Sequence, residues 1–124
     1  MVALSKSIKR VMALLTDPLT CEFVGVARPE QMSLEETARL TPALKRLKVP
    51  VRRLLINGVV PEEAARGCAF CAARLSHQCE VIEDFRARFK KGVELFVAAE
   101  QPHEVRGPAH LRAHFAGWRK VKSR

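Results

Sequence analysis

The chain has 124 residues, and the 48% that are apolar suffice for the core of one domain or of a piece of one, which excludes a disordered tail. No apolar run approaches the roughly 20 residues that span a bilayer, and the start, MVALSKSIKR, lacks the apolar stretch of a signal peptide, so we expect a cytoplasmic protein. The formal net charge of +9 suggests nucleic acid, but most basic residues are scattered without interleaved aromatics, so we expect no nucleic-acid partner.

The first elements expected are a helix and a short buried strand. Near the N-terminus apolar residues recur at gaps of four, three and four, as on one face of a helix. These residues are Leu4, Ile8, Val11 and Leu15. Asp17 and Pro18 end this helix. Residues 21–27, CEFVGVA, are typical of a buried strand, which Pro29 stops.

A second helix is expected to begin at Ser33. The spacing of Ser33 and Glu36 is that of a capping box, in which each side chain bonds a backbone N–H of the first turn. Its apolar face is formed by Leu40, Leu44 and Leu47. Pro42 lies inside this pattern, where proline costs about 3 kcal/mol. We therefore expect a kink or an early stop at Pro42.

The second half of the chain predicts two strands and two helices. Residues 51–61 form a second apolar strand, broken by Asn57 and Gly58, and residues 93–99 form a third. Between them runs the clearest helix, whose inward residues recur at alternating gaps of four and three. These are Cys71, Leu75, Gln78, Ile82, Phe85 and Phe89. A last helix starts at Pro108. Its buried residues are expected to be Leu111, Phe115 and Trp118.

The predicted order is therefore α-β-α-β-α-β-α, which indicates an α/β fold. Strands that alternate with helices of this length imply a parallel sheet with right-handed crossovers. Parallel sheets are normally covered on both faces, so three parallel strands make a thin sheet that looks incomplete.

Ligands of open parallel sheets bind beyond the carboxyl ends of the strands, where three unusual loops fall together. These loops are residues 27–33, 57–71 and 100–107. The amide of Asn57 offers a donor and an acceptor side by side, which matches the N6 and N7 edge of adenine. The alternative is an Asn-Gly turn that serves the backbone alone. Glu30 also has a simple alternative, as a solvated carboxylate.

Two cysteines, Cys68 and Cys71, lie three residues apart at a helix start, which brings their sulfurs to one side. A closed zinc site needs four ligands, and this pair supplies two. Cys21 lies at the opposite rim of the sheet, and Cys79 is roughly 16 Å along the helix from Cys68. A second copy of the chain would supply the missing pair across a two-fold axis. By spacing alone, zinc, a redox pair and inert thiols remain open.

Four segments together resemble the C-terminal part of the anion-transporting ATPase family, which contains the arsenical pump-driving ATPases and the ATPase that delivers tail-anchored membrane proteins. The segment FVGVARPEQMSLEETARL is similar to the family's strand followed by PExLSLxETxRL. RRLLINGVVP resembles its apolar strand ending in Asn, and CAFCAARLSHQCEVIEDF resembles its CxxCxARxxxQ helix. PHEVRGPAHLRAHF resembles its final loop and helix, so the likeness covers roughly residues 20 to 118.

The resemblance implies roles for individual residues. It implies that Asn57 reads adenine, that Glu30 contacts the nucleotide, and that Cys68 and Cys71 form half of a zinc site shared across a homodimer. It also implies that one loop wraps the base of ATP. That loop consists of Pro102, His103, Glu104, Val105 and Arg106. Residues 1–19 are then a helix from the end of a helical subdomain, and residues 20–124 are the C-terminal part of the ATPase domain.

The catalytic half of the family is missing from this stretch. No GxxxxGK[ST] motif occurs, and neither of the two aspartates, Asp17 and Asp84, lies in a switch motif. We therefore expect ATP and Mg²⁺ chemistry only with an N-terminal P-loop half, and no hydrolysis by this chain alone. A membrane pump and a tail-anchored client are the partners that the family implies, and the sequence does not choose between them. A non-enzymatic zinc-linked scaffold and a CxxC redox protein are the alternatives.

Overall fold

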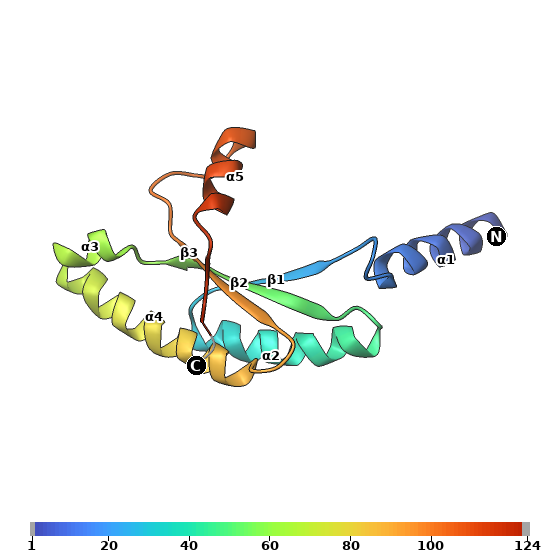
Figure 1. The fold of residues 1–124 in the computed structure, drawn as a ribbon, viewed down its shortest axis with the longest axis horizontal. Coiled ribbons are helices and arrows are strands. Elements are labelled where there is room, and N and C mark those ends of the chain that lie inside the picture. The colour runs from blue at the N-terminus through green and yellow to red at the C-terminus, as the bar shows by residue number, and fades with distance from the viewer. Residues whose placement is uncertain (1, 123–124) are drawn as a thin grey trace.

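The computed structural model describes residues 2–122, which form five helices and four strands (Figure 1). In chain order these elements are α1 (Val2–Thr16), β1 (Phe23–Ala27), α2 (Gln31–Arg46), β2 (Val51–Val59), α3 (Glu62–Arg66), α4 (Ala69–Arg88), β3 (Glu94–Ala99), α5 (Gly107–Ala116) and β4 (Arg119–Lys120). The predicted α/β class is confirmed. The short helix α3 and the strand β4 were not predicted, because five and two residues are too few to show a period.

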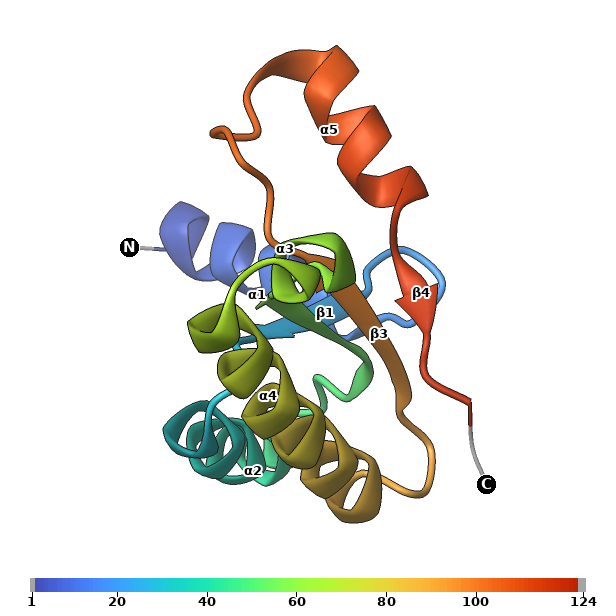
Figure 2. The same ribbon diagram turned by 90° about the vertical axis from the view of Figure 1, so that its left-hand side faces the viewer.

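The four strands lie side by side in sequence order. The strands β1, β2 and β3 are parallel, as predicted, whereas β4 pairs antiparallel with β3. Both long connecting helices, α2 and α4, lie on the same face of the sheet (Figure 2). This follows from the order, since successive crossovers of one hand in one direction place their helices on one side.

The core lies between this face and the two helices. Leu34 of α2, Leu54 and Ile56 of β2, and Val81 and Phe85 of α4 pack there, and Ile56 and Phe85 have no exposed surface. The inward face of α4 is centred on Gln78, Val81 and Phe85, which are its buried residues. Leu75, Ile82 and Phe89, which the period also placed inward, are partly buried at its margins.

The opposite face of the sheet is only partly covered. Side chains alternate between faces along a strand, and those opposite the core form what we call the open face. Its residues are Val24, Val26, Arg53, Leu55, Asn57, Glu94, Phe96 and Ala98. Over β1 it is bare, since Val24 and Val26 are 41% and 66% exposed. The expectation of a sheet that lacks part of its cover therefore agrees with the structure.

The helix α5 covers the open face less than predicted. Leu111 and Phe115, which were expected to be buried, are 42% and 54% exposed, and α5 has no buried residue. The helix stands away from the sheet (Figure 1) and reaches it through Trp118, just beyond its end. The Trp118 ring lies 6.2 Å from that of Phe96 and 5.1 Å from that of Phe115, between ring centroids. An aromatic cluster thus covers the β3 side of the open face.

Two details of α2 differ from the prediction. The helix begins at Gln31, with Glu30 as its N-cap, and Ser33 lies inside the first turn. The Ser33 hydroxyl accepts a hydrogen bond from the Arg28 N–H at 2.9 Å, so the expected capping box is wrong. Pro42 does not end the helix, which continues to Arg46. The reason is that Leu34 and Leu44, on either side of Pro42, both pack on the core and hold the helix in place.

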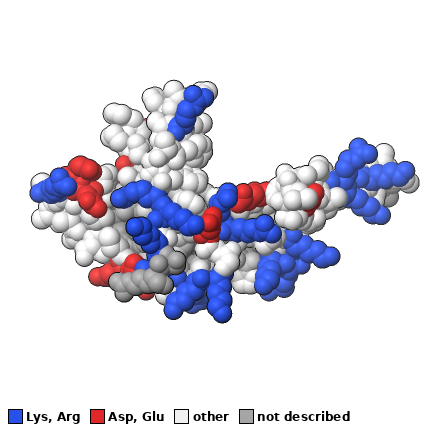
Figure 3. All heavy atoms as spheres, viewed as in Figure 1, with Lys and Arg blue, Asp and Glu red and all other residues white. Residues whose placement is uncertain are grey.

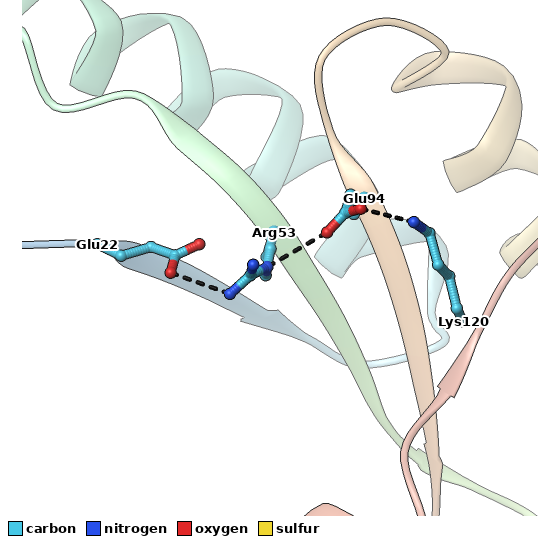
Figure 4. A network of polar contacts seen from close by, with 4 residues as sticks. All are labelled: Glu22, Arg53, Glu94 and Lys120. Atoms are coloured by element: carbon cyan, nitrogen blue, oxygen red, sulfur yellow. Dashed lines mark hydrogen bonds and ion pairs between the residues drawn. The ribbon is translucent and has the colours of Figure 1, made fainter. Parts of the chain in front are cut away.

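A chain of charged side chains crosses the sheet near the amino ends of its parallel strands (Figure 4). The Arg53 Nη1 atom lies 3.0 Å from Glu22 Oε2, and Arg53 Nε lies 3.2 Å from Glu94 Oε2. The Lys120 ammonium contacts the other oxygen of Glu94. These contacts lower the pKa of Glu94, chiefly through the hydrogen bonds from Lys120 and Arg53.

The Glu94→Gln variant is expected to unfold at a lower temperature than the parent at pH 7. Because the folded state lowers the pKa of Glu94, its stabilisation is present above the ordinary value of about 4.3 and disappears as the pH falls through the folded value. Thermal unfolding between pH 7 and pH 3 should show the two melting temperatures converging in acid. In Glu104→Gln, which removes a carboxylate paired only within its own loop, the difference should be small throughout. A gap for Glu94→Gln that does not narrow as the pH falls toward 3 would contradict this account.

The basic side chains are spread over several elements. On the face that Figure 3 shows, Lys and Arg lie over α1, α2 and the sheet, with acidic groups between some of them. This agrees with the scattered pattern of the sequence. None of the helices within residues 2–122 combines the length and the apolar composition needed to cross a membrane.

Candidate functional site

The structure brings the three predicted loops to one edge of the sheet, at the carboxyl ends of β1, β2 and β3. The N–H of Glu100 donates to the Val59 carbonyl at 2.8 Å, which joins the ends of β3 and β2. The Arg28 guanidinium, after β1, lies over Gly58, where the first carbon of any side chain would be 3.0 Å from Nη1. We call this the carboxyl edge. Its residues are Arg28, Glu30, Asn57, Gly58, Val60 and Glu100.

Asn57 occupies a half-buried position on β2, on the open face. The expected break at Asn57 and Gly58 is wrong, because β2 continues through both to Val59. The strand is instead irregular there, with a register shift between Ile56 and Val59 and a φ of 78° at Gly58 that favours glycine. Within residues 2–122 no hydrogen bond engages the Asn57 amide, so its donor and acceptor are available to a ligand.

A buried glutamine fixes the backbone that follows Asn57. The side chain of Gln78, on α4, is 3% exposed. Its Oε1 accepts the Val60 N–H at 2.8 Å, and its Nε2 donates to the Gly58 carbonyl at 3.4 Å. Sequence reasoning counted Gln78 only as part of an apolar face. A polar residue in the middle of an apolar period was the signal that could have identified it, since a buried amide needs partners.

Glu30 lies close to the carboxyl edge on the N-cap of α2. Its carboxylate is 3.2 Å from Arg28 Nε, and its side chain is 54% exposed. The same Arg28 guanidinium lies over Gly58, so one arginine links Glu30 to the end of β2. The structure therefore places Glu30 and Asn57 at the same edge.

The loop from Pro102 to Arg106 follows β3 and leads away from α2 and α4 toward α5 (Figure 1). The loop is mostly exposed. An ion pair forms within it, between Arg106 Nη2 and Glu104 Oε2 at 3.1 Å. The Arg106 carbonyl, at the N-cap of α5, is 2.9 Å from Nδ1 of His110. The structure thus places Glu30 and Asn57 at one edge, and no hydrogen bond or ion pair within residues 2–122 ties the loop to either of them.

The two cysteines of the CxxC pair meet at the start of α4. Cys68 is the N-cap, and its sulfur accepts the Cys71 N–H at 3.2 Å. Hydrogen bonding from Cys71 lowers the pKa of Cys68 and raises that of Cys71, so Cys68 is the thiol that ionises first. Within residues 2–122 no cluster of three or more Cys, His, Asp or Glu side chains is arranged to hold a metal. Two half-exposed thiols supply two of the four ligands that a closed zinc site needs.

Two hollows lie away from the carboxyl edge, near the amino ends of the strands. One, of about 770 Å³, is bordered by Cys21, Lys45 and Arg52, and the other, of about 1180 Å³, by Phe89 and Lys120. Neither includes a residue of the carboxyl edge.

Residues 1–117, nearly the whole chain, match the family described as "Anion-transporting ATPase". The chain belongs to this family. It is 33% identical over 109 residues to "ATPase ARSA2" of Chlamydomonas reinhardtii, which covers 86% of this chain and 29% of that protein. It is 32% identical over 104 residues to "ATPase GET3B" of Arabidopsis thaliana, covering 83% and 25%. With "ATPase GET3C" of the same plant the identity is 34% over 110 residues, covering 88% and 28%.

These comparisons confirm the resemblance seen in the sequence. The family match reaches back through α1, which the four motifs did not cover. In each of these three relatives the match to this anion-transporting ATPase chain spans less than a third of the relative's length.

Proposed function

We propose that this chain forms the adenine-binding side and the dimer interface of a cytoplasmic anion-transporting ATPase. Residues 1–19 would be the end of a helical subdomain, and residues 20–124 the C-terminal part of the ATPase domain. The observation that carries the proposal is the carboxyl edge, where the loops after β1, β2 and β3 converge around the Asn57 amide, which no hydrogen bond within residues 2–122 engages. This is the position at which open parallel sheets bind ligands.

The roles of the residues follow from their places. Asn57 would pair with the N6 and N7 edge of adenine, with its backbone held by Gln78. Glu30 would contact the nucleotide beside it, with Arg28 as its partner. The exposed loop from Pro102 to Arg106 would close over the base, which requires it to move toward the carboxyl edge.

Hydrolysis requires groups that these 124 residues lack. No GxxxxGK[ST] motif is present to hold the phosphates and Mg²⁺. We expect ATP hydrolysis when this chain is mixed with the part of ATPase GET3C that lies outside the matched segment, produced separately, and none from either component alone. Phosphate release measures it. If the mixture is as inactive as its components, this chain does not work as one part of a divided ATPase.

Replacing Asn57 by alanine is expected to weaken ATP binding by that mixture about tenfold. A base hydrogen bond contributes about 1–1.5 kcal/mol, and 1.4 kcal/mol corresponds to a factor of ten. Titration with a fluorescent ATP analogue measures the affinity. Gln101→Ala is the control, because Gln101 also follows the carboxyl end of a strand, and its amide donates to the Ala99 carbonyl as its one hydrogen bond within residues 2–122. Equal affinities for the two variants would remove Asn57 from the site.

The partners of the assembled ATPase follow from the CxxC pair and from the family. Cys68 and Cys71 of two chains would together hold one Zn²⁺ and make a homodimer. When bound, the metal would supply a structural crosslink between the chains. A membrane pump or a tail-anchored client would be the downstream partner, and the surface does not favour one over the other.

A second candidate, a dithiol redox function, is favoured by the asymmetry of the pair. The pKa of Cys68 is lowered and that of Cys71 raised, which is the division between an attacking and a resolving thiol. If the pair is redox-active, Cys71→Ser should trap a mixed disulfide between Cys68 and an added disulfide substrate, visible as a mass increase. Absence of the trapped species would eliminate this candidate.

A further inference from the structure

The hollow of about 770 Å³ lies at the amino ends of the parallel strands, at the opposite rim of the sheet from the carboxyl edge. Residues at the starts of β1, β2 and β3 line it, together with the ends of α1 and α2. We call it the amino-end hollow. Its cationic residues are Lys45, Lys48, Arg52 and Arg53. Cations that converge on one concave surface create a positive potential there, which favours an anionic ligand.

Most of this positive charge is not neutralised by the protein. The two carboxylates of the hollow, Glu22 and Glu94, both pair with Arg53, at 3.0 and 3.2 Å (Figure 4). The other cations come from α2, from the loop after it and from β2. Those that form no ion pair within residues 2–122 are Lys45, Lys48 and Arg52.

Lys48 has an unusual backbone conformation at the rim of the hollow. Its φ is 62°, and it is the one residue other than glycine with a positive φ within residues 2–122. It follows the C-cap of α2, where the Val49 N–H donates to the Leu44 carbonyl at 2.9 Å and closes a Schellman turn. Glycine ordinarily occupies this position, because a side chain is strained at such a φ.

The helix itself does not require a lysine at this position. The last turn of α2 already contains two basic residues that complement the helix dipole. Residues held in strained backbone conformations gather at sites that bind ligands. The strained Lys48 is therefore an observation, independent of the charge count, that points to a ligand in the hollow.

A β-bulge brings a second cation to the same place. Val51 of β2 pairs with Phe23 of β1. The next pair joins Arg53 to Val24, which leaves Arg52 without a partner on β1. A bulge interrupts the alternation of side chains along a strand and redirects one of them. Arg52 and Arg53 are accordingly both exposed and both line the hollow, although they are neighbours on one strand.

Apolar side chains also line the amino-end hollow. Leu15 belongs to α1, Phe23 begins β1 and Val93 precedes β3. Phe23 and Val93 are partly buried and pack against the core, so they form a fixed surface. A ligand that covers this surface gains the free energy of removing apolar area from water, which an inorganic ion cannot do.

We propose that the amino-end hollow binds a small organic phosphate, which combines a phosphoryl group with a short hydrocarbon part. A phosphate ester carries a charge of about −1.5 to −2 at pH 7 and three acceptor oxygens, which suits cations from three elements better than a single carboxylate does. Arg52 would contact two phosphate oxygens and Lys48 a third, while the hydrocarbon lies on Phe23 and Val93. The proposed adenine site is at the other ends of the strands, so this ligand is a separate one.

Calorimetric titration of the 124-residue chain with hexyl phosphate tests the proposal. We expect one hexyl phosphate per chain and an affinity that weakens as sodium chloride is added, because salt screens exposed charges. Inorganic phosphate, which has the charge without the hydrocarbon, should bind about tenfold more weakly.

The Lys48→Gly variant separates binding from stability. Glycine relieves the strained φ, so this variant should melt at a higher temperature than the parent. It also removes a cation from the hollow, so its affinity for hexyl phosphate should fall about tenfold. A lysine with only a structural role would not give a more stable protein that binds the anion less well.

Arg52→Gln should also weaken the binding of hexyl phosphate about tenfold. The matched control is Arg112→Gln, because Arg112 is an exposed arginine of α5 outside the hollow. The control removes the same net charge and should leave the affinity within about twofold of the parent. Asn57→Ala should leave it unchanged as well, since Asn57 lies at the carboxyl edge.

Four outcomes would overturn the proposal. They are no binding of hexyl phosphate, no loss of affinity in Lys48→Gly and Arg52→Gln, equal losses in Arg52→Gln and Arg112→Gln, and a loss in Asn57→Ala. The third would mean that net charge alone attracts the anion, and the fourth would place it at the carboxyl edge. Vesicles that contain phosphatidic acid identify the source of the phosphate. Cosedimentation that Lys48→Gly abolishes would assign it to a lipid headgroup, and binding of hexyl phosphate alone would assign it to a soluble ester.

Discussion

The Cys71→Ser variant is expected to lose both bound zinc and the dimer. If the proposed shared site forms, protein purified without chelator should carry about half a mole of zinc per chain and have the mass of a dimer, because Cys68 and Cys71 would supply two of its four ligands. Serine in place of one cysteine leaves at most two thiolates in the shared site. Structural zinc sites contribute about 10–16 kcal/mol of apparent free energy, so the loss should be complete at micromolar concentrations.

The matched control for this prediction is Cys79→Ser. Cys79 is exposed on the same helix, two turns beyond Cys71, and should be dispensable for metal and dimer alike. Metal analysis and mass in solution decide the matter. A metal-free monomer of the parent chain would contradict the shared zinc site and leave the redox candidate for this pair.

The Phe85→Ala variant is expected to lower the free energy of unfolding by about 3–5 kcal/mol. Phe85 has no exposed surface and packs between α4 and the sheet, with its ring 6.1 Å from that of Phe89. Removing a buried ring loses its transfer free energy and leaves a cavity. Domains are stable by about 5–15 kcal/mol, so this change removes a large share of the total.

Urea denaturation followed by circular dichroism measures this difference. Phe115→Ala removes an identical ring from a position that is 54% exposed, and its effect should be much smaller. Similar losses for the two variants would mean that the interface between α4 and the sheet is not the main core of the molecule.

The elements with strong periodic patterns were predictable from the sequence, and those fixed by distant contacts were not. The period through Leu75, Ile82 and Phe89 located α4, because a helix that packs on a sheet must repeat its apolar residues. The same argument wrongly predicted that Leu111 and Phe115 are buried, since an apolar helical face does not show which other element packs against it. The strand β4 is too short to show an apolar period in the sequence, because only its pairing with β3 makes these two residues a strand.

The candidate site was predictable in position but not in detail. The rule for open parallel sheets placed Glu30 and Asn57 at one edge, and the structure puts them there. The expected break at Asn57 was wrong, because β2 resumes its pairing with β3 at Val59 after a local irregularity. Gln78 was missed as a positioning residue, since its partners are backbone groups about 20 residues away.

Through the buried side chain of Gln78, the helix α4 connects the two proposed sites, which are the carboxyl edge and the CxxC pair. The Gln78 amide forms hydrogen bonds with the backbone on both sides of Val59, just after Asn57. The amino end of the same helix carries Cys68 and Cys71. If α4 shifts or rotates, either the end of β2 follows or the buried amide loses its partners, at a cost of about 1–3 kcal/mol for each. Joining or separating two chains at the cysteines would therefore change the backbone beside Asn57, although the CxxC pair and the adenine base would not be in contact.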